Sequence, residues 1–220
     1  MKAVGESIEL LYAAFAGQAR PLKISYCPCC ITDEEIATLL GSGLREIPPE
    51  VLAPYASSAF LTVGNVADYL YFLPRILEIT ATDDQWWPDP EVTGRAISTA
   101  KLDSWPASRL DALTGFLAAV IDSAIGSGEY LKIDPWMCAI ARMGIDVRPY
   151  LQRIAASPDA VLAYFEDNAR CLPKNRLCNA FWELPNAGHD AIVDWFHSEP
   201  IRKIPFEAYG YLMAPEGENL

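Results

Sequence analysis

Apolar residues recur at the three- and four-residue spacing of an α-helix along nearly the whole chain, whereas alternating runs bounded by hairpin turns are scarce. This period places apolar side chains on one face of a helix and cannot line one face of a strand. The patterned segments are about 10 to 20 residues long and are joined by short turns, which is typical of packed antiparallel helix pairs. The pattern predicts an all-α fold. A compact irregular array and a HEAT-like stack of antiparallel helix pairs both agree with it, because no fixed-period repeat is present.

Capping chemistry predicts where the helices begin. Thr32, followed three residues later by Glu35, forms a capping box, and Asn65 is an N-cap residue for the next strongly apolar segment. Pro54 is expected to disturb one helix and Pro74 to kink or divide another. We expect helices over 1–17, 33–41, 48–64, 66–79, 89–101, 104–126, 134–144, 158–170, 190–198 and 200–212, a short helix within 171–188, a loop over 82–90 and a frayed end over 215–220.

The helix after Asn65 is apolar over most of its circumference, so it is expected to be central. Hydrophobic residues make up 51% of the 220 residues, enough to bury a substantial core. We therefore expect a single all-helical domain over residues 1–220, with a subdivision near 126–134 as the alternative.

The formal net charge of −12 sets up a field that repels phosphate backbones, which argues against nucleic-acid binding and favours basic partners. Glu6 and Glu9 interrupt the apolar N-terminal stretch, so it is interpreted as an amphipathic helix rather than a secretion signal. Proline, aspartate, glutamate or arginine is expected to break every run of the ~20 apolar residues that a bilayer span needs. These features predict a soluble cytoplasmic protein without a membrane partner.

Three segments resemble a widespread family of uncharacterised bacterial proteins. They are CPCC at 27–30, PPEVLAPYASSAFLTVGNVADYLYFLPRILEI at 48–79 and DSWPASRLDALTGFL at 103–117. The resemblance covers roughly the first 140 residues, and the Tyr-Phe-Leu-Pro-Arg segment is its most distinctive part. It implies a bacterial origin and an all-helical fold, and it implies no activity.

Cys27 and Cys30 form a C-x-x-C pair just before the capped helix at Thr32, where the helix N-terminus stabilises thiolates. We favour a tight turn with half-buried thiols over a metal site, and a metal site over redox chemistry. A structural zinc needs about four ligands, and no second closely spaced pair is present. The missing ligands would have to come through tertiary folding from Cys171, Cys178, His189 or His197. We thus expect no cofactor, with zinc at Cys27 and Cys30 as the alternative.

The six cysteines are expected to be reduced thiols, since a core of this size does not need disulfides. Cys138, Cys171 and Cys178 lie among apolar neighbours and are expected to be small buried side chains. The only two histidines, His189 and His197, are expected at the surface. No nucleophile or oxyanion donor accompanies them, so whether the protein is an enzyme stays open, and we favour a non-enzymatic protein.

Asp68, Tyr71, Arg75 and Glu78 follow one another at helical spacing and form a polar stripe on the apolar central helix. Such a stripe is interpreted either as the lining of a ligand-binding groove or as an internal network that joins neighbouring helices. We favour the network.

A second candidate binding region combines acidic and aromatic residues in turns, which is the composition of a binding hot spot for a basic partner. The alternative is that its tryptophans fold back over a small core. Its residues are Asp83, Asp84, Trp86, Trp87, Asp89, Asp103 and Trp105.

Charge, acidic-aromatic turns and the missing catalytic set together favour a non-enzymatic helical protein that binds a basic protein, with an immunity-type inhibitor of a basic toxin as one example by analogy. The alternative function is that of a small metal-binding or redox protein that uses Cys27 and Cys30.

Overall fold

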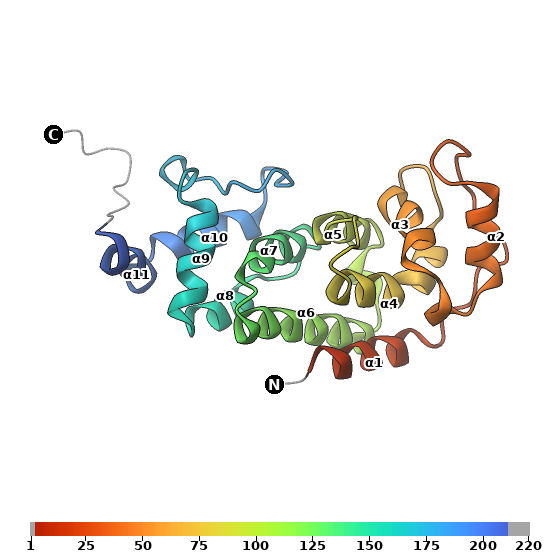
Figure 1. Cartoon of the computed structure of the whole chain (residues 1–220), viewed down its shortest axis with the longest axis horizontal. Helices are drawn as coiled ribbons and strands as arrows, with labels where there is room; N and C mark the ends of the chain where they lie inside the picture. The colour runs from red at the N-terminus through yellow and green to blue at the C-terminus, as the bar shows by residue number, and fades with distance from the viewer. Residues whose placement is uncertain (1–2, 211–220) are drawn as a thin grey trace. The chain divides into compact units, whose positions relative to one another are not determined.

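The computed structural model describes residues 3–210, and within this range the fold is all-α, as the helical period predicts (Figure 1). The described residues contain no strand, only isolated bridges between Tyr26 and Val63 and between Ala59 and Val63. The α-helices are α1 (Val4–Phe15), α2 (Asp33–Gly41), α3 (Pro49–Ser58), α4 (Val66–Thr82), α5 (Pro90–Thr99), α6 (Ala107–Ser127), α7 (Ile133–Arg142), α8 (Arg148–Ala155), α9 (Pro158–Asn168), α10 (Ala187–His197) and α11 (Glu199–Tyr209). Short 3-10 helices lie at Leu44–Glu46, Leu102–Ser104, Tyr130–Lys132 and Leu172–Lys174.

The chain divides into two compact units, Met1–Ala119 and Val120–Leu220. The division falls inside α6, six residues before the segment 126–134 that was the alternative boundary. Each unit has its own packed helices.

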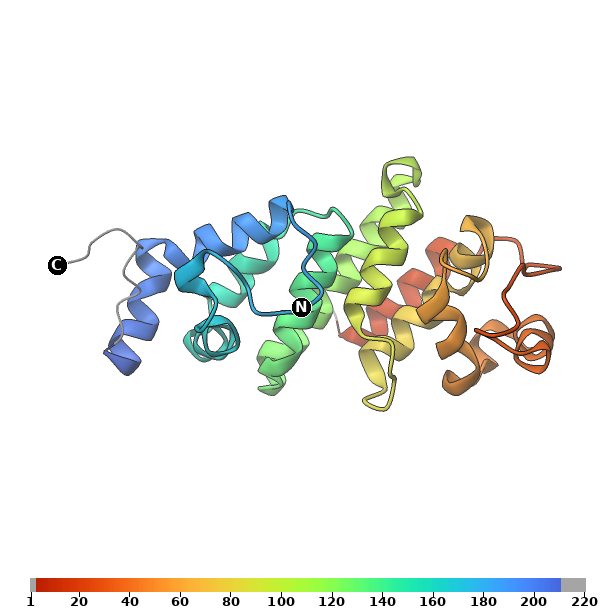
Figure 2. The same cartoon turned by 90° about the horizontal axis from the view of Figure 1, so that it is seen from above.

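The first unit is built around α4, as predicted. This helix packs against α1, α3 and α5, and α2 packs against α3 (Figure 2). Nine residues of α4 are buried, including Phe72, Leu73, Ile76 and Leu77, because the apolar side chains cover most of its circumference. Of the two outcomes expected at Pro74, a kink or a division of the helix, the division does not occur, since α4 is one helix through Pro74. This proline removes the backbone bond to the carbonyl four residues before it.

The second unit is built around α7, α9 and α10. Helix α10 packs against α7, α8 and α11, and α9 packs against α7, α8 and α11. Its buried side chains include Trp136, Ile154, Tyr164 and Phe196. Helix α8 was not predicted, because its eight residues lack a capping side chain and follow the αL residue Gly144 closely.

The predicted cap residues are confirmed. The Thr32 hydroxyl accepts a hydrogen bond from the Glu35 backbone N–H, and the Asn65 side chain accepts from the backbone N–H groups of Ala67 and Asp68. The Ser157 hydroxyl likewise accepts from Ala160 at the start of α9. These ends were predictable because their chemistry is local.

One predicted helix is too long. The prediction extended the helix from Pro48 toward Gly64, but α3 ends at Ser58. Phe60 then has a φ of 62°, which lies in the left-handed region and breaks a right-handed helix. The segment from Ala59 to Gly64 instead forms a loop that pairs with the segment before Cys27.

The expectation that all cysteines are reduced is wrong for two of them, since Cys171 and Cys178 form a disulfide. Their segment holds only the 3-10 helix Leu172–Lys174, so no helix includes Phe181 or Trp182. The expectation of surface histidines is wrong for His189, which is 3% exposed in the second unit.

Helix α6 bears on the membrane prediction without overturning it, because charged residues interrupt its apolar run. By length and composition alone it could cross a membrane, since its 21 residues include only Arg109, Asp111 and Asp122 as charged side chains. Buried core helices of water-soluble proteins have the same composition, and 44% of its apolar window is buried inside the structure. The predicted end of the last helix at Leu212 and the predicted fraying of 215–220 lie outside the described residues.

Candidate metal centre

The Cys-Pro-Cys-Cys segment is a tight turn immediately before α2. The backbone carbonyl of Cys27 accepts hydrogen bonds from the N–H groups of Cys30, at 2.9 Å, and Ile31, at 3.3 Å. Closing the chain on itself in this way places Cys27, Cys29 and Cys30 next to one another. The expected turn is confirmed.

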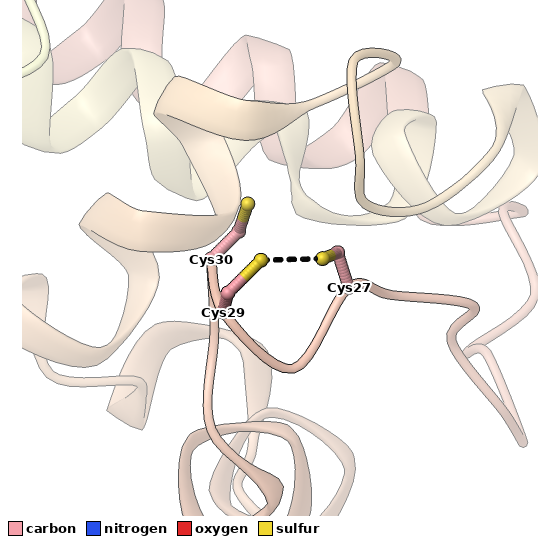
Figure 3. Close-up of side chains that lie close together, drawn as sticks. All are labelled: Cys27, Cys29 and Cys30. Atoms are coloured by element: carbon pink, nitrogen blue, oxygen red, sulfur yellow. Dashed lines mark hydrogen bonds between the residues drawn. The ribbon is translucent and has the colours of Figure 1, made fainter.

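The three thiols of this turn form a cluster, in which the side chains of Cys27 and Cys29 point toward each other and that of Cys30 lies beside them (Figure 3). The Sγ atoms of Cys27 and Cys29 are 2.7 Å apart, and all three Sγ atoms lie within 4.8 Å of one another. Cys29 is exposed, and the other two are half-buried. The C-x-x-C pattern includes only Cys27 and Cys30, so it did not predict Cys29 as a member of the cluster. The position of Cys29 within the same four-residue turn was the signal that could have predicted it.

The loop after α3 anchors the turn on its N-terminal side. The Cys27 N–H donates to the Thr62 carbonyl at 3.0 Å, and the Gly64 N–H donates to the Ser25 carbonyl at 2.8 Å. These bonds flank the bridge between Tyr26 and Val63. A cavity of about 380 Å³, lined by residues 25–27 and 60–64, lies beside the Cys27 side of the cluster.

The capping box of α2 anchors the turn on its C-terminal side. The Glu35 carboxylate accepts hydrogen bonds from the Thr32 N–H at 2.7 Å and from the Thr32 hydroxyl at 2.8 Å. The Glu35 N–H donates back to that hydroxyl at 3.2 Å. Helix α2 therefore begins at Asp33, three residues after Cys30, at a position that its sequence specifies.

Hydrogen bonding between the thiols separates their acidities. Either thiol can donate in the contact between Cys27 and Cys29; with the proton on Cys29, the bond lowers the pKa of Cys27 from its ordinary value. The same bond raises the pKa of Cys29 to about 11, because losing its proton would break the bond and place two thiolates side by side. Cys27 is therefore the first of the two to become a thiolate, the form that attacks electrophiles and binds metals.

Thiolates bind soft metal ions. Each of the four residues named as prospective further ligands has a partner of its own within the second unit. Cys171 and Cys178 are bound to each other. The Nε2 atom of His189 accepts a hydrogen bond from the Leu177 N–H, and its Nδ1 atom lies 3.0 Å from Asp190. The Nε2 atom of His197 lies 3.1 Å from the Asn175 side-chain oxygen. Within residues 3–210, only Cys27, Cys29 and Cys30 form a group of this kind.

The polar residues of α4 divide into two sets. The Asp68 carboxylate is buried and accepts from the Asn65 N–H at 3.2 Å, completing the cap of α4. Arg75 and Glu78 pair at 2.8 Å, and the Arg75 guanidinium also donates to the Ile47 carbonyl. Asp68 therefore serves the helix end, whereas Arg75 and Glu78 connect α4 to its neighbours.

The tyrosine of α1 extends this network. The Tyr12 hydroxyl donates to Glu78 at 2.5 Å, and burial together with this bond raises the pKa of Tyr12. Tyr71 lies outside the network, on the wall of a cavity of about 400 Å³ that Tyr12, Arg45 and Pro74 also line. Arg75 and Glu78 thus belong to an internal network of the kind that the sequence favoured. Of the four residues of the polar stripe, Tyr71 is the one that lines a cavity.

The acidic-aromatic segment lies in the loop between α4 and α5. Trp87 is 59% exposed there, and the Asp83 carboxylate accepts from the Gln85 N–H at 2.9 Å. The buried indole N–H of Trp86 has no acceptor among the residues that the structure describes. Asp84 lies in the same turn.

Trp105 does not belong to an exposed patch. It is 7% exposed, its indole N–H donates to the Ala100 carbonyl at 3.0 Å, and its ring packs edge-on against Phe15 with centroids 5.5 Å apart. This tryptophan covers the core, and Trp87 is the exposed one.

Comparison with protein-family models, with curated proteins and with solved structures finds no match to this chain.

Proposed function

We propose that the protein binds a thiophilic metal ion with the thiolates of Cys27, Cys29 and Cys30. The observation that supports this most directly is the approach of three Sγ atoms to within 4.8 Å of one another. A metal–sulfur bond of about 2.3 Å places bound sulfurs about 4 Å apart, so modest side-chain rotations bring all three to one ion. Thiolates select zinc, copper(I) and iron–sulfur clusters over hard cations.

The electrostatics of the turn support the same function. The lowered pKa of Cys27 favours its thiolate form, which is the form that binds an ion. A bound cation then favours loss of the remaining protons, because a coordinating thiol is deprotonated by the metal charge. Binding therefore releases protons, and the affinity rises with pH.

The experiment is a titration of the reduced protein with cobalt(II), whose thiolate complexes absorb strongly, combined with elemental analysis of protein purified without chelators. We expect one ion per chain and loss of the absorption in the Cys29→Ser variant. Cys138→Ala is the matched control, because this cysteine is buried in α7 and lies outside the cluster. A folded, reduced protein that binds no cobalt(II), zinc(II) or copper(I) would refute the proposal.

A second candidate function is binding of a basic protein through the loop between α4 and α5. It is supported by the 59% exposure of Trp87 beside Asp84 and Asp89, in a chain of net charge −12. An exposed tryptophan contributes anchor area at an interface, and surrounding carboxylates raise the association rate with a basic partner. A basic toxin has this chemistry.

This second function is tested by affinity capture from a native lysate at low and high salt, with the Trp87→Ala variant in parallel. We expect a basic protein that is retained less at high salt and is lost in the variant. Retention that depends on neither salt nor Trp87 would exclude this loop as the binding surface.

A further inference from the structure

We propose that the ion held at the Cys27–Cys29–Cys30 cluster is copper(I), bound by these three thiolates alone. This inference rests on the proposed metal-binding function and specifies its ligand. The argument uses the number of ligands, their chemical type and their accessibility.

The cluster provides three ligands, and the carboxylates of Asp33 and Glu35 at the start of α2 are already engaged. The Tyr26 hydroxyl donates to the Asp33 carboxylate. The Glu35 carboxylate is held by two bonds from Thr32, and its loss would open the start of α2. No histidine or carboxylate within residues 3–210 joins the three sulfurs. The described residues therefore supply three ligands at this site.

Zinc and copper(I) respond differently to three ligands. Structural zinc sites are closed by four protein ligands, so zinc here would need water or another group in the fourth position. Copper(I) is a soft d¹⁰ cation that three thiolates satisfy in a plane, without a fourth ligand. The ligand count thus favours copper(I).

The type of ligand points the same way. All three donors are sulfur, and in the described part of the chain no histidine or carboxylate ligand adds harder character to the set. The sulfurs come from a single four-residue turn, and three sulfurs that surround one ion in a plane lie about 4 Å apart when each metal–sulfur bond is about 2.3 Å long. Because the three Sγ atoms lie within 4.8 Å of one another, all of them can bind the same ion.

Accessibility indicates that the ion exchanges. Cys29 is exposed and Cys27 and Cys30 are only half-buried, so an incoming thiolate can approach the ion. Copper(I) enters by replacing three thiol protons, which pass to the buffer, and no change in oxidation state occurs. The site would therefore accept copper(I) from another soft-ligand carrier and give it up to one.

The test begins with protein loaded with one equivalent of zinc(II), to which copper(I) is added anaerobically as its bicinchoninate complex. We expect stoichiometric loss of the chelate colour, release of zinc(II) to a zinc-sensitive dye, and copper-edge absorption fine structure with three sulfur neighbours. If zinc(II) stays bound and copper(I) remains on the chelator, the assignment of the ion as copper(I) is overturned, whereas the proposed metal binding stands. A protein that binds neither ion would overturn both.

Variants test the ligand number. Cys29→Ser is expected to lower the copper(I) affinity by more than about 100-fold, since losing a ligand costs more than losing the outer-shell partners worth about 10–100-fold. Cys138→Ala should leave the affinity unchanged. Circular dichroism verifies that both variants fold. Unchanged copper(I) affinity in a folded Cys29→Ser variant would refute the three-thiolate site.

Discussion

The hydroxyl of Tyr55 lies directly beneath Gly64, so that a Cβ atom added at Gly64 would be 2.7 Å from the hydroxyl oxygen. Gly64 has a φ of 71°, in the region that favours glycine, and its N–H donates to Ser25 in the segment that leads to Cys27. The close approach of this ring therefore helps to position the loop that anchors the thiol cluster.

We predict that Gly64→Ala lowers the free energy of unfolding by about 1–3 kcal/mol, through backbone strain and the collision with Tyr55. Urea unfolding measures the change, and Gly128→Ala is the matched control, because Gly128 has a φ of 75° with open space around it. Tyr55→Phe should restore part of the loss in the Gly64→Ala background. Equal losses in the two glycine variants would show that the collision contributes nothing.

Alkylation of the reduced, metal-free protein is predicted to distinguish the thiols. Cys27 should react at lower pH than an ordinary thiol because its pKa is lowered, whereas Cys29 should react fully only as the pH nears its pKa of about 11. Peptide mapping by mass spectrometry after iodoacetamide treatment, from neutral to alkaline pH, measures each rate. In Cys29→Ala the pKa of Cys27 should return toward its ordinary value. Identical pH profiles for both thiols would contradict the hydrogen bond between them.

The cap of α2 is predicted to support both stability and metal binding. Thr32→Ala should lower the free energy of unfolding by about 1 kcal/mol, because it removes the hydroxyl that accepts from Glu35. It should also weaken cobalt(II) binding, since the turn loses its C-terminal anchor. Thr38→Ala, in the same helix but away from the cap, serves as the control for both measurements and should change neither. If Thr32→Ala and Thr38→Ala had the same stability and the same cobalt(II) affinity, the cap would contribute nothing to the metal site.

Trp87 and Trp105 are predicted to differ sharply in how much their replacement by alanine changes the free energy of unfolding. Trp87→Ala should change the free energy of unfolding by less than about 0.5 kcal/mol, because this side chain is largely exposed. Trp105→Ala should cost about 3–5 kcal/mol, since it leaves a cavity beside Phe15 and breaks the bond to Ala100. Chemical denaturation of both variants gives the comparison. A large cost for Trp87→Ala would mean that this residue is structural.

The disulfide is predicted to stabilise the second unit. The bond closes a loop between residues seven positions apart, for which the loop-entropy relation gives about 2.5 kcal/mol. The double variant Cys171→Ser, Cys178→Ser should lose about this amount in urea unfolding under non-reducing conditions. The wild-type protein should lose a similar amount when reductant is added. Two free thiols at these positions in the unreduced protein, detected by mass spectrometry, would contradict the bond.

Features specified by neighbouring residues were predictable from the sequence. The start of α2 at Thr32, the cap at Asn65 and the central position of α4 follow from side chains within a few residues of one another and from their period. The C-x-x-C pair was recognised for the same reason. The all-α fold class is the sum of such local preferences.

Tertiary structure decided the features that join distant residues. Pairing of Ser25–Cys27 with Thr62–Gly64 ended α3 early, the Cys171–Cys178 bond formed across an irregular segment, and His189 became buried by accepting from Leu177. The spacing of apolar residues along the sequence carries no information on such contacts, because each contact depends on where two separate segments come together. The sequence by itself determined the helices and the presence of three thiols in one four-residue segment, whereas the tertiary structure determined that this segment is anchored to the loop after α3, because the bonds of Cys27 to Thr62 and of Gly64 to Ser25 join residues far apart in the sequence.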